Sequence, residues 1–130
     1  MSGRRVLLVE DEVLVRELLA EVLSEAGYRV VEAGTGDEAA ALIEAHGAAR
    51  DGHGGFDVLL TGIATPGRLD GVAVARRARG LRPDVPVVFV SGRPDQGAWT
   101  RRLGQPCLFI PKPFRLSSVL AAVQRLAARG

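Results

Sequence analysis

Apolar residues are grouped along the chain in two alternating patterns, short continuous runs and longer stretches with helical spacing. The continuous runs are rich in valine, leucine and isoleucine, and most are followed by charged residues, glycine or proline. Runs of this kind predict strands that are buried on both faces of a sheet. The five predicted strands are Val6–Val9, Arg29–Ala33, Val58–Leu60, Val87–Val90 and Cys107–Ile110.

The stretches between these runs have apolar residues every three or four positions, which predicts helices with one apolar face. Two of them carry start signals, because Thr35 and Glu38 have the spacing of a capping box and Asp70 is placed as an N-cap. Gly27 supplies the stop of the first helix. The predicted helical segments are Val13–Ala26, 36–45, Gly71–Arg79, Trp99–Leu103 and Leu116–Ala127.

Strands that alternate with helices predict an α/β protein with a parallel sheet and helices on both faces. Five such units in 130 residues fit a single domain over residues 1–130. We therefore expect a three-layer, doubly wound (βα)5 fold of the flavodoxin-like type, with strand order 2-1-3-4-5 and right-handed crossovers. In such a sheet the functional site lies at the carboxyl ends of the strands, between the first strand and the third.

Composition and charge narrow the range of functions. Apolar residues make up 47% and charged residues 25% of the chain, as in an ordinary globular protein. The formal net charge is +2 and the arginines are dispersed, so neither nucleic acid nor a membrane is an expected partner. Cys107 is the sole cysteine, and the first apolar run is too short for a signal peptide or a membrane span. These features predict a cytoplasmic protein.

The residues at the carboxyl ends of the strands define a candidate site. The first strand delivers Glu10 and Asp11, the third Gly62, the fourth Ser91 and the fifth Lys112. Two adjacent acids repel each other unless a cation neutralises them, and hard oxygen ligands suit Mg²⁺. A hydroxyl and an ammonium group opposite the acids suit the oxygens of a phosphoryl group. The sequence therefore predicts a metal and phosphoryl pocket without a central carboxylate, since Gly62 has no side chain.

Four motifs occur in order over essentially the whole chain: VLLVEDE, FDVLLTGIATPG with RLDG, PVVFVSG and IPKPF. Together they resemble the receiver domain of bacterial two-component response regulators. The resemblance implies that Glu10 and Asp11 bind Mg²⁺, and that Ser91 and Lys112 are the hydroxyl and lysine residues of the phosphorylation site. Its partners would be a sensor histidine kinase, a phosphotransfer protein or a downstream signalling protein.

The resemblance implies further roles at particular positions. The backbone carbonyl of Ala64 would be a metal ligand, Phe109 would be the aromatic switch residue, and the Lys112–Pro113 peptide bond would be cis. The face formed by the fourth helix, the fifth strand and the fifth helix would be the output surface, and a homodimer could form through it.

The sequence departs from the family at the residue that accepts the phosphoryl group. That residue is an aspartate four positions before the loop proline, and counting back from Pro66 leads to Gly62. Asp57, at the start of the strand, gives the same register. The expected function is therefore a degenerate receiver, a non-enzymatic module that binds partners without being phosphorylated. Mg²⁺ binding should be weak or absent because one carboxylate ligand is missing.

Two other functions stay open at this stage. The first is a conventional phosphorelay receiver that uses another acceptor residue or whose aspartate was replaced by mutation. The second is a small flavodoxin-like enzyme that binds a flavin or a nucleotide. The sequence disfavours the second, because Gly34, Thr35 and Gly36 lack the other glycines and the lysine of a nucleotide-binding loop.

The candidate residues also have structural interpretations. Asp11 could cap the helix that follows it, Lys112 could be a surface lysine, and Ser91 could simply end its strand. Phe109 could be a core aromatic, and Trp99 could either contact a partner or cover the core.

Two further observations concern residues that could be mistaken for site residues. Thr61 is expected to pack in the core, because strand alternation turns it away from the face of Gly62. His46, Asp51 and His53 are not expected to hold a metal, because the glycine-rich loop around them is not rigid.

Overall fold

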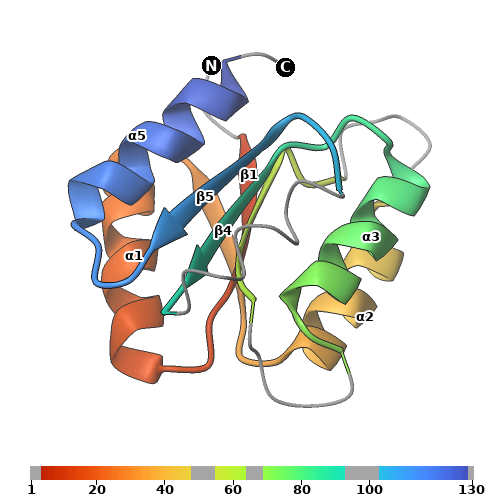
Figure 1. The fold of residues 1–130 in the computed structure, drawn as a ribbon, viewed down its shortest axis with the longest axis horizontal. Helices are drawn as coiled ribbons and strands as arrows, with labels where there is room; N and C mark the ends of the chain where they lie inside the picture. The colour runs from red at the N-terminus through yellow and green to blue at the C-terminus, as the bar shows by residue number, and fades with distance from the viewer. Residues whose placement is uncertain (1–3, 48–54, 64–68, 93–102, 129–130) are drawn as a thin grey trace.

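The computed structural model describes residues 4–47, 55–63, 69–92 and 103–128. Five strands form one sheet, and helices lie against both of its faces (Figure 1). The strands are β1 (Arg5–Val9), β2 (Arg29–Ala33), β3 (Val58–Gly62), β4 (Val87–Ser91) and β5 (Cys107–Pro111). The helices are α1 (Val13–Glu25), α2 (Gly36–Gly47), α3 (Gly71–Leu81) and α5 (Leu116–Ala127).

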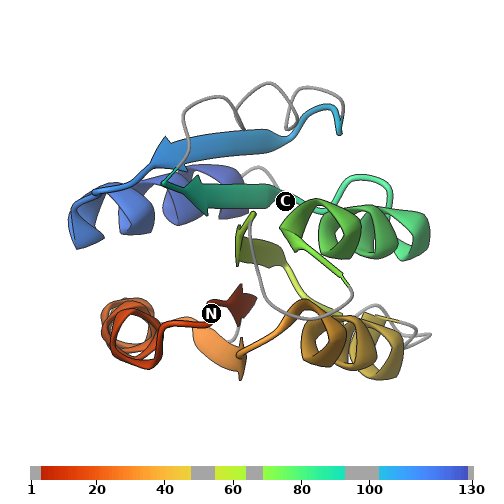
Figure 2. The same cartoon turned by 60° about the horizontal axis from the view of Figure 1, so that its bottom comes forward.

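All strand pairs are parallel, and the order across the sheet is β2-β1-β3-β4-β5. Helices α1 and α5 cover one face, and α2 and α3 cover the other, as the two views in Figures 1 and 2 show. The predicted fold class and strand order are therefore confirmed. This order places β1 beside β3 at the centre, with the carboxyl ends of all five strands along one edge.

The central strands β1, β3 and β4 are almost entirely buried on both faces, as the continuous apolar runs predicted, whereas the edge strands β2 and β5 are partly exposed. Alternate residues of each strand enter different core clusters, because successive side chains of a strand point to opposite faces. Leu7, Leu59 and Phe89 belong to the cluster beneath α2 and α3. Leu8 and Leu60, one position further along their strands, belong to the cluster beneath α1 and α5.

The predicted elements that fall on described residues are present with small shifts at their ends. Helix α1 ends one residue earlier than expected, at Glu25, while α2 and α3 each continue two residues further, to Gly47 and Leu81. The continuation of α3 is consistent with its sequence, because the first strong breaker after Arg79 is Pro83. The predicted helical segment Trp99–Leu103 lies outside the described residues, apart from Leu103.

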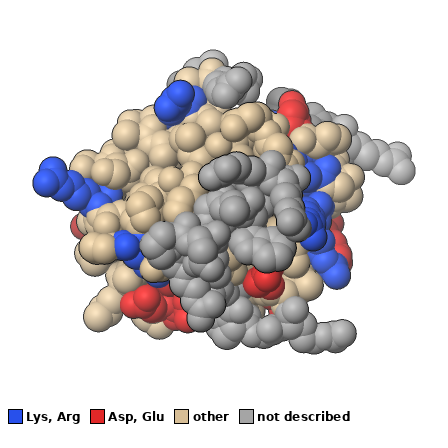
Figure 3. All heavy atoms as spheres, viewed as in Figure 1, with Lys and Arg blue, Asp and Glu red and all other residues tan. Residues whose placement is uncertain are grey.

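The surface charge agrees with the balanced composition. On the face in Figure 3, acidic and basic side chains are interspersed around the edge, and no continuous basic area is formed by the described residues. None of the described helices is long and apolar enough to cross a membrane.

Candidate functional site

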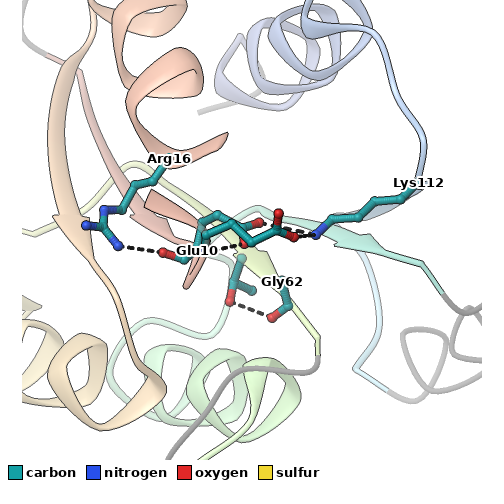
Figure 4. Close-up of polar contacts among 6 residues, drawn as sticks. Glu10, Arg16, Gly62 and Lys112 are labelled. Atoms are coloured by element: carbon teal, nitrogen blue, oxygen red, sulfur yellow. Dashed lines mark hydrogen bonds and ion pairs between the residues drawn. The ribbon is translucent and has the colours of Figure 1, made fainter. Parts of the chain in front are cut away.

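Glu10 lies directly after β1, and only 2% of its surface is exposed. Its backbone N–H donates to the carbonyl of Ala33 at 3.0 Å, so the strand pairing with β2 fixes its position. Its carbonyl accepts from Arg16 Nη1 at 2.8 Å, and its Oε2 accepts from the backbone N–H of Glu12 at 3.1 Å (Figure 4). The carboxylate is therefore held inside the carboxyl edge of the sheet.

Lys112 reaches Glu10 from the other side of the site (Figure 4). It follows β5, and its backbone N–H donates to the carbonyl of Ser91 at 2.7 Å. Its Nζ lies 3.5 Å from Oε1 of Glu10 and 3.5 Å from Oε1 of Glu12. The peptide bond between Lys112 and Pro113 is cis, and so is the bond between Gln105 and Pro106, which the sequence analysis did not predict.

The surroundings of Glu10 raise the pKa of its carboxyl above the ordinary value. Burial is the largest cause, because it removes water from the charged form. The amide of Glu12 and the ammonium group of Lys112 act in the opposite direction and favour the charged form, whereas Asp11 raises the pKa further. Lys112 thus compensates part of the cost of a buried carboxylate.

Gly62 is the last residue of β3 and is buried at the centre of this edge. It is paired in register with Val90 of β4, and its carbonyl accepts from the Thr61 hydroxyl at 2.9 Å. Thr61 is fully buried, as expected. Gly62 provides only backbone atoms to the site, so no carboxylate projects from β3 toward Lys112.

The other predicted site residues are placed as follows. Ser91 is 5% exposed at the end of β4, and Asp11 is exposed next to Glu10. Phe109 is partly buried and packs against the core cluster beneath α2 and α3. Asp57 lies at the opposite end of β3, where it accepts from the Arg5 backbone N–H at 2.7 Å. Ala64 lies outside the described residues.

The described residues do not form a recognisable metal site. They contain no group of three or more His, Cys, Asp or Glu side chains that could hold an ion. Both carboxylate oxygens of Glu10 already face protein partners, and position 62 has no side chain to offer a ligand. His46 instead packs edge-on against Phe56, with ring centroids 5.6 Å apart, and Asp51 and His53 lie outside the described residues.

A groove of about 510 Å³ lies beside this site, between α1 and the segment that connects β5 to α5. The helical spacing of the apolar residues in α1 did not reveal it. That spacing includes Leu14 and Leu18, yet these side chains are 75% and 50% exposed. The groove is lined by Glu12, Val15, Leu18, Lys112, Pro113, Phe114 and Leu116.

Comparison with known proteins identifies the family. Residues 6–124 match the model of the response regulator receiver domain. The chain therefore belongs to the response regulator receiver family, whose members are signalling modules of two-component systems. Receiver domains generally bind Mg²⁺ at the acceptor site.

Individual relatives agree with this assignment. The chain is 33% identical over 134 residues to the transcriptional regulatory protein TcrA of Mycobacterium tuberculosis, an alignment that covers 100% of this chain and 48% of TcrA. It is 29% identical over 129 residues to the response regulator receiver protein CpdR of Brucella abortus, covering 95% of this chain and 96% of CpdR. The chain thus spans about half the length of TcrA and nearly all of CpdR.

A solved structure supports the fold assignment directly. The crystal structure of a response regulator receiver protein from Sinorhizobium medicae superposes with a TM-score of 0.82 at 28% identity. The superposition covers 97% of this chain and 95% of that protein.

Proposed function

We propose that this chain is a degenerate receiver that acts in two-component signalling without being phosphorylated. The observation that carries the proposal is Gly62, which ends β3 at the carboxyl edge of the sheet. Glycine has no carboxylate, so an acyl phosphate cannot form on it. The rest of the site, with Glu10, Ser91 and Lys112 at the ends of the neighbouring strands, is retained.

The same residues support weak or absent Mg²⁺ binding. A typical site for this ion combines carboxylates with water and other oxygen ligands in octahedral geometry. In this chain Asp11 is exposed, but the Glu10 carboxylate is engaged by the Glu12 amide and by Lys112. With no acid on β3, the remaining ligands are fewer than the family pattern requires. The proposed roles of Asp11 and of the Ala64 carbonyl would then be vestigial.

A module of this kind would act through protein contacts. Its partners would be a sensor histidine kinase, a phosphotransfer protein or a downstream signalling protein. The groove beside Lys112 supports a binding role, because exposed apolar residues next to a concave surface favour contact with another protein. A phosphorylation-independent receiver would bind such a partner constitutively or in competition with an intact receiver.

The proposal is tested by intact-mass measurement after incubation with acetyl phosphate and Mg²⁺, on the wild-type chain and on Gly62→Asp. We expect a phosphate-sized increase in the variant only, since it restores a carboxylate at the end of β3. An increase in both proteins would mean that another residue accepts the phosphoryl group. That result would favour the alternative function, a conventional phosphorelay receiver. If neither protein gains mass, the site has lost more than the acceptor residue.

One alternative acceptor is disfavoured by its contacts. The Thr61 hydroxyl is fully buried and donates to the carbonyl of Gly62 at 2.9 Å, so it is not presented to a phosphodonor. Peptide mapping of any phosphorylated wild-type protein would identify the residue.

A further inference from the structure

Lys112 is the only lysine in the sequence, and its ammonium group lies at equal distances from two carboxylates. Nζ is 3.5 Å from Oε1 of Glu10 and 3.5 Å from Oε1 of Glu12. The side chain of Glu10 is 2% exposed, that of Lys112 30% and that of Glu12 63%. The cation therefore joins a buried acid to an exposed one at the mouth of the site.

The carboxylates around Lys112 repel one another, so a nearby positive charge stabilises them. Glu10, Asp11 and Glu12 are consecutive, and a carboxylate buried as deeply as that of Glu10 is costly unless it is paired and hydrogen-bonded. The Glu12 amide satisfies Oε2 of Glu10 at 3.1 Å, which leaves Oε1 for the ammonium group. The contact with Glu10 is screened less by water than an exposed ion pair would be.

The neighbouring cation does not serve this purpose. Arg16 donates from Nη1 to the backbone carbonyl of Glu10, and its Nε pairs with Glu32 on β2 at 3.3 Å. Its guanidinium group thus holds the backbone carbonyl of Glu10 and neutralises the carboxylate of Glu32 on β2. Among the described ion pairs, only that of Lys112 reaches the Glu10 carboxylate.

Two features of the site allow Lys112 to hold this position. Its N–H is bonded to the Ser91 carbonyl at 2.7 Å, which anchors the residue to the end of β4. Gly62, at the centre of the edge, offers no competing carboxylate. An aspartate at position 62 would draw the ammonium group toward β3 and away from Glu12.

We propose that Lys112 is a built-in counter-ion that replaces a divalent cation at this edge, so that the acidic segment from Glu10 to Glu12 keeps its structure without metal. The proposal rests on the two ion pairs and on Gly62. It does not depend on phosphorylation-independent signalling, because a chain that accepted phosphate elsewhere could still carry this counter-ion.

The first test is thermal unfolding of the full chain in EDTA and in excess Mg²⁺. We expect the wild-type Tm to be unchanged by Mg²⁺. In EDTA, Lys112→Met should have a lower Tm than the wild-type chain. In Mg²⁺ the Tm of the variant should rise by about 4 °C or more, because the ion can then bind the acids without competition from the ammonium group. The matched control is Arg77→Met, which removes an exposed cation paired with Glu44 on the α2–α3 side and should not become responsive to Mg²⁺.

Either of two results would overturn the proposal. A wild-type Tm that rises by about 4 °C or more in Mg²⁺ would mean that a metal binds despite Lys112. A folded Lys112→Met variant whose Tm ignores Mg²⁺ would mean that the lysine does not occupy the place of an ion.

The second test uses the wild-type fold, so it does not depend on whether Lys112→Met folds. Because the chain has one lysine, isotopically labelled lysine gives one set of side-chain NMR signals. We expect the Nζ and ε-methylene signals to shift in Glu12→Gln, whose side chain is exposed, and to stay in place on addition of Mg²⁺. Signals that move saturably with Mg²⁺, or that are identical in Glu12→Gln, would contradict the proposed ion pairs.

Discussion

Glu10 combines near-complete burial with an ionisable group, and its contacts show how the chain tolerates this. The Glu12 amide and the Lys112 ammonium group stabilise the carboxylate, but burial outweighs them and the pKa of Glu10 is raised. A raised pKa means that the native state binds the proton more tightly than the unfolded chain does. This linkage gives a prediction about pH.

Glu10→Gln removes this titration. The free energy of unfolding of the wild-type chain, minus that of Glu10→Gln, should be larger at low pH than at neutral pH, because protonation of Glu10 favours the native state. The contribution is fully present below the ordinary pKa of 4.5 and is lost as the pH rises through the raised native value. Urea unfolding of both proteins in EDTA, between pH 4 and 8, measures the difference in free energy of unfolding. The wild-type advantage should fall as the pH rises; parallel curves, or a rise, would contradict the shift.

Arg79 is a second residue whose importance lies in its contacts. Its guanidinium group donates to backbone carbonyls from two separate segments, one after α3 and one before β5. The acceptors are Val85 at 2.7 Å, Leu103 at 3.2 Å, Gly104 at 3.2 Å and Pro106 at 2.7 Å. Burial lowers the pKa of this arginine, although arginine remains charged throughout the ordinary pH range.

Arg79→Met should lower the free energy of unfolding by about 2–3 kcal/mol, because several carbonyls lose a charged donor. The control is Arg77→Met on the same helix. Arg77 makes an exposed pair with Glu44 at 3.1 Å, and its loss should cost less than about 1 kcal/mol. Urea unfolding at pH 7 compares the two variants. Equal losses would mean that the network around Arg79 contributes no more than a surface ion pair.

At the level of elements, the start of α3 is set by its close approach to the end of β3. The Gly71 N–H donates to the Ile63 carbonyl at 2.8 Å, and Asp70 caps the helix by accepting from the Ala73 N–H at 2.8 Å. A Cβ atom on Gly71 would collide with the carbonyl of Gly62 and lie 2.9 Å from Cα of Ile63. Both neighbours are backbone atoms, so a side chain here forces the helix away from the sheet.

Gly71→Ala should therefore destabilise the chain by about 1–3 kcal/mol, the range for overpacking in a close-packed interior. Gly80→Ala, near the other end of α3, should do the opposite. Among the described residues, no atom outside its chain neighbours and its own helix backbone lies within 4 Å of the added Cβ, and alanine is favoured over glycine inside a helix by about 0.5–1 kcal/mol. Thermal unfolding of both variants gives the signs. Two variants of equal stability would show that α3 can shift freely.

The sequence predicted elements better than it predicted contacts between them. Asp70 caps α3 as expected, and the Thr35 hydroxyl accepts from the Glu38 N–H at 3.1 Å. The return bond of the expected capping box differs, since Glu38 Oε1 accepts from Gly34 rather than Thr35. Local spacing fixes such bonds to within a residue, because the partners are only three or four positions apart.

Contacts across the fold could not be read from spacing. The partners of Arg79 before β5 are 24 to 27 positions away in the chain, so no local pattern announces them. The exposure of Leu14 and Leu18 could not be predicted from the sequence either. Helical spacing identifies which residues share a face, but the neighbours of α1 in the fold decide how much of that face is covered.

At the scale of the whole molecule, the predicted strand order is confirmed. The alternation of strands and helices gave the α/β class, and the motifs placed Glu10, Ser91 and Lys112 at one edge of the sheet. The ion pairs of Lys112 with Glu10 and Glu12 required the structure, since the partners are about a hundred positions apart. The chain thus has the receiver architecture, and in it Lys112 pairs with the carboxylates of Glu10 and Glu12.

The most direct test of this account is the ¹H–¹⁵N amide spectrum of the wild-type chain before and after addition of Mg²⁺ and acetyl phosphate. With no carboxylate at Gly62 and with Lys112 paired to acids of the chain, the amides of Glu10, Gly62 and Ser91 should shift no more than that of the remote Gly80. Saturable shifts confined to the first three amides would contradict the account, because they would show a site that still takes up metal or phosphate.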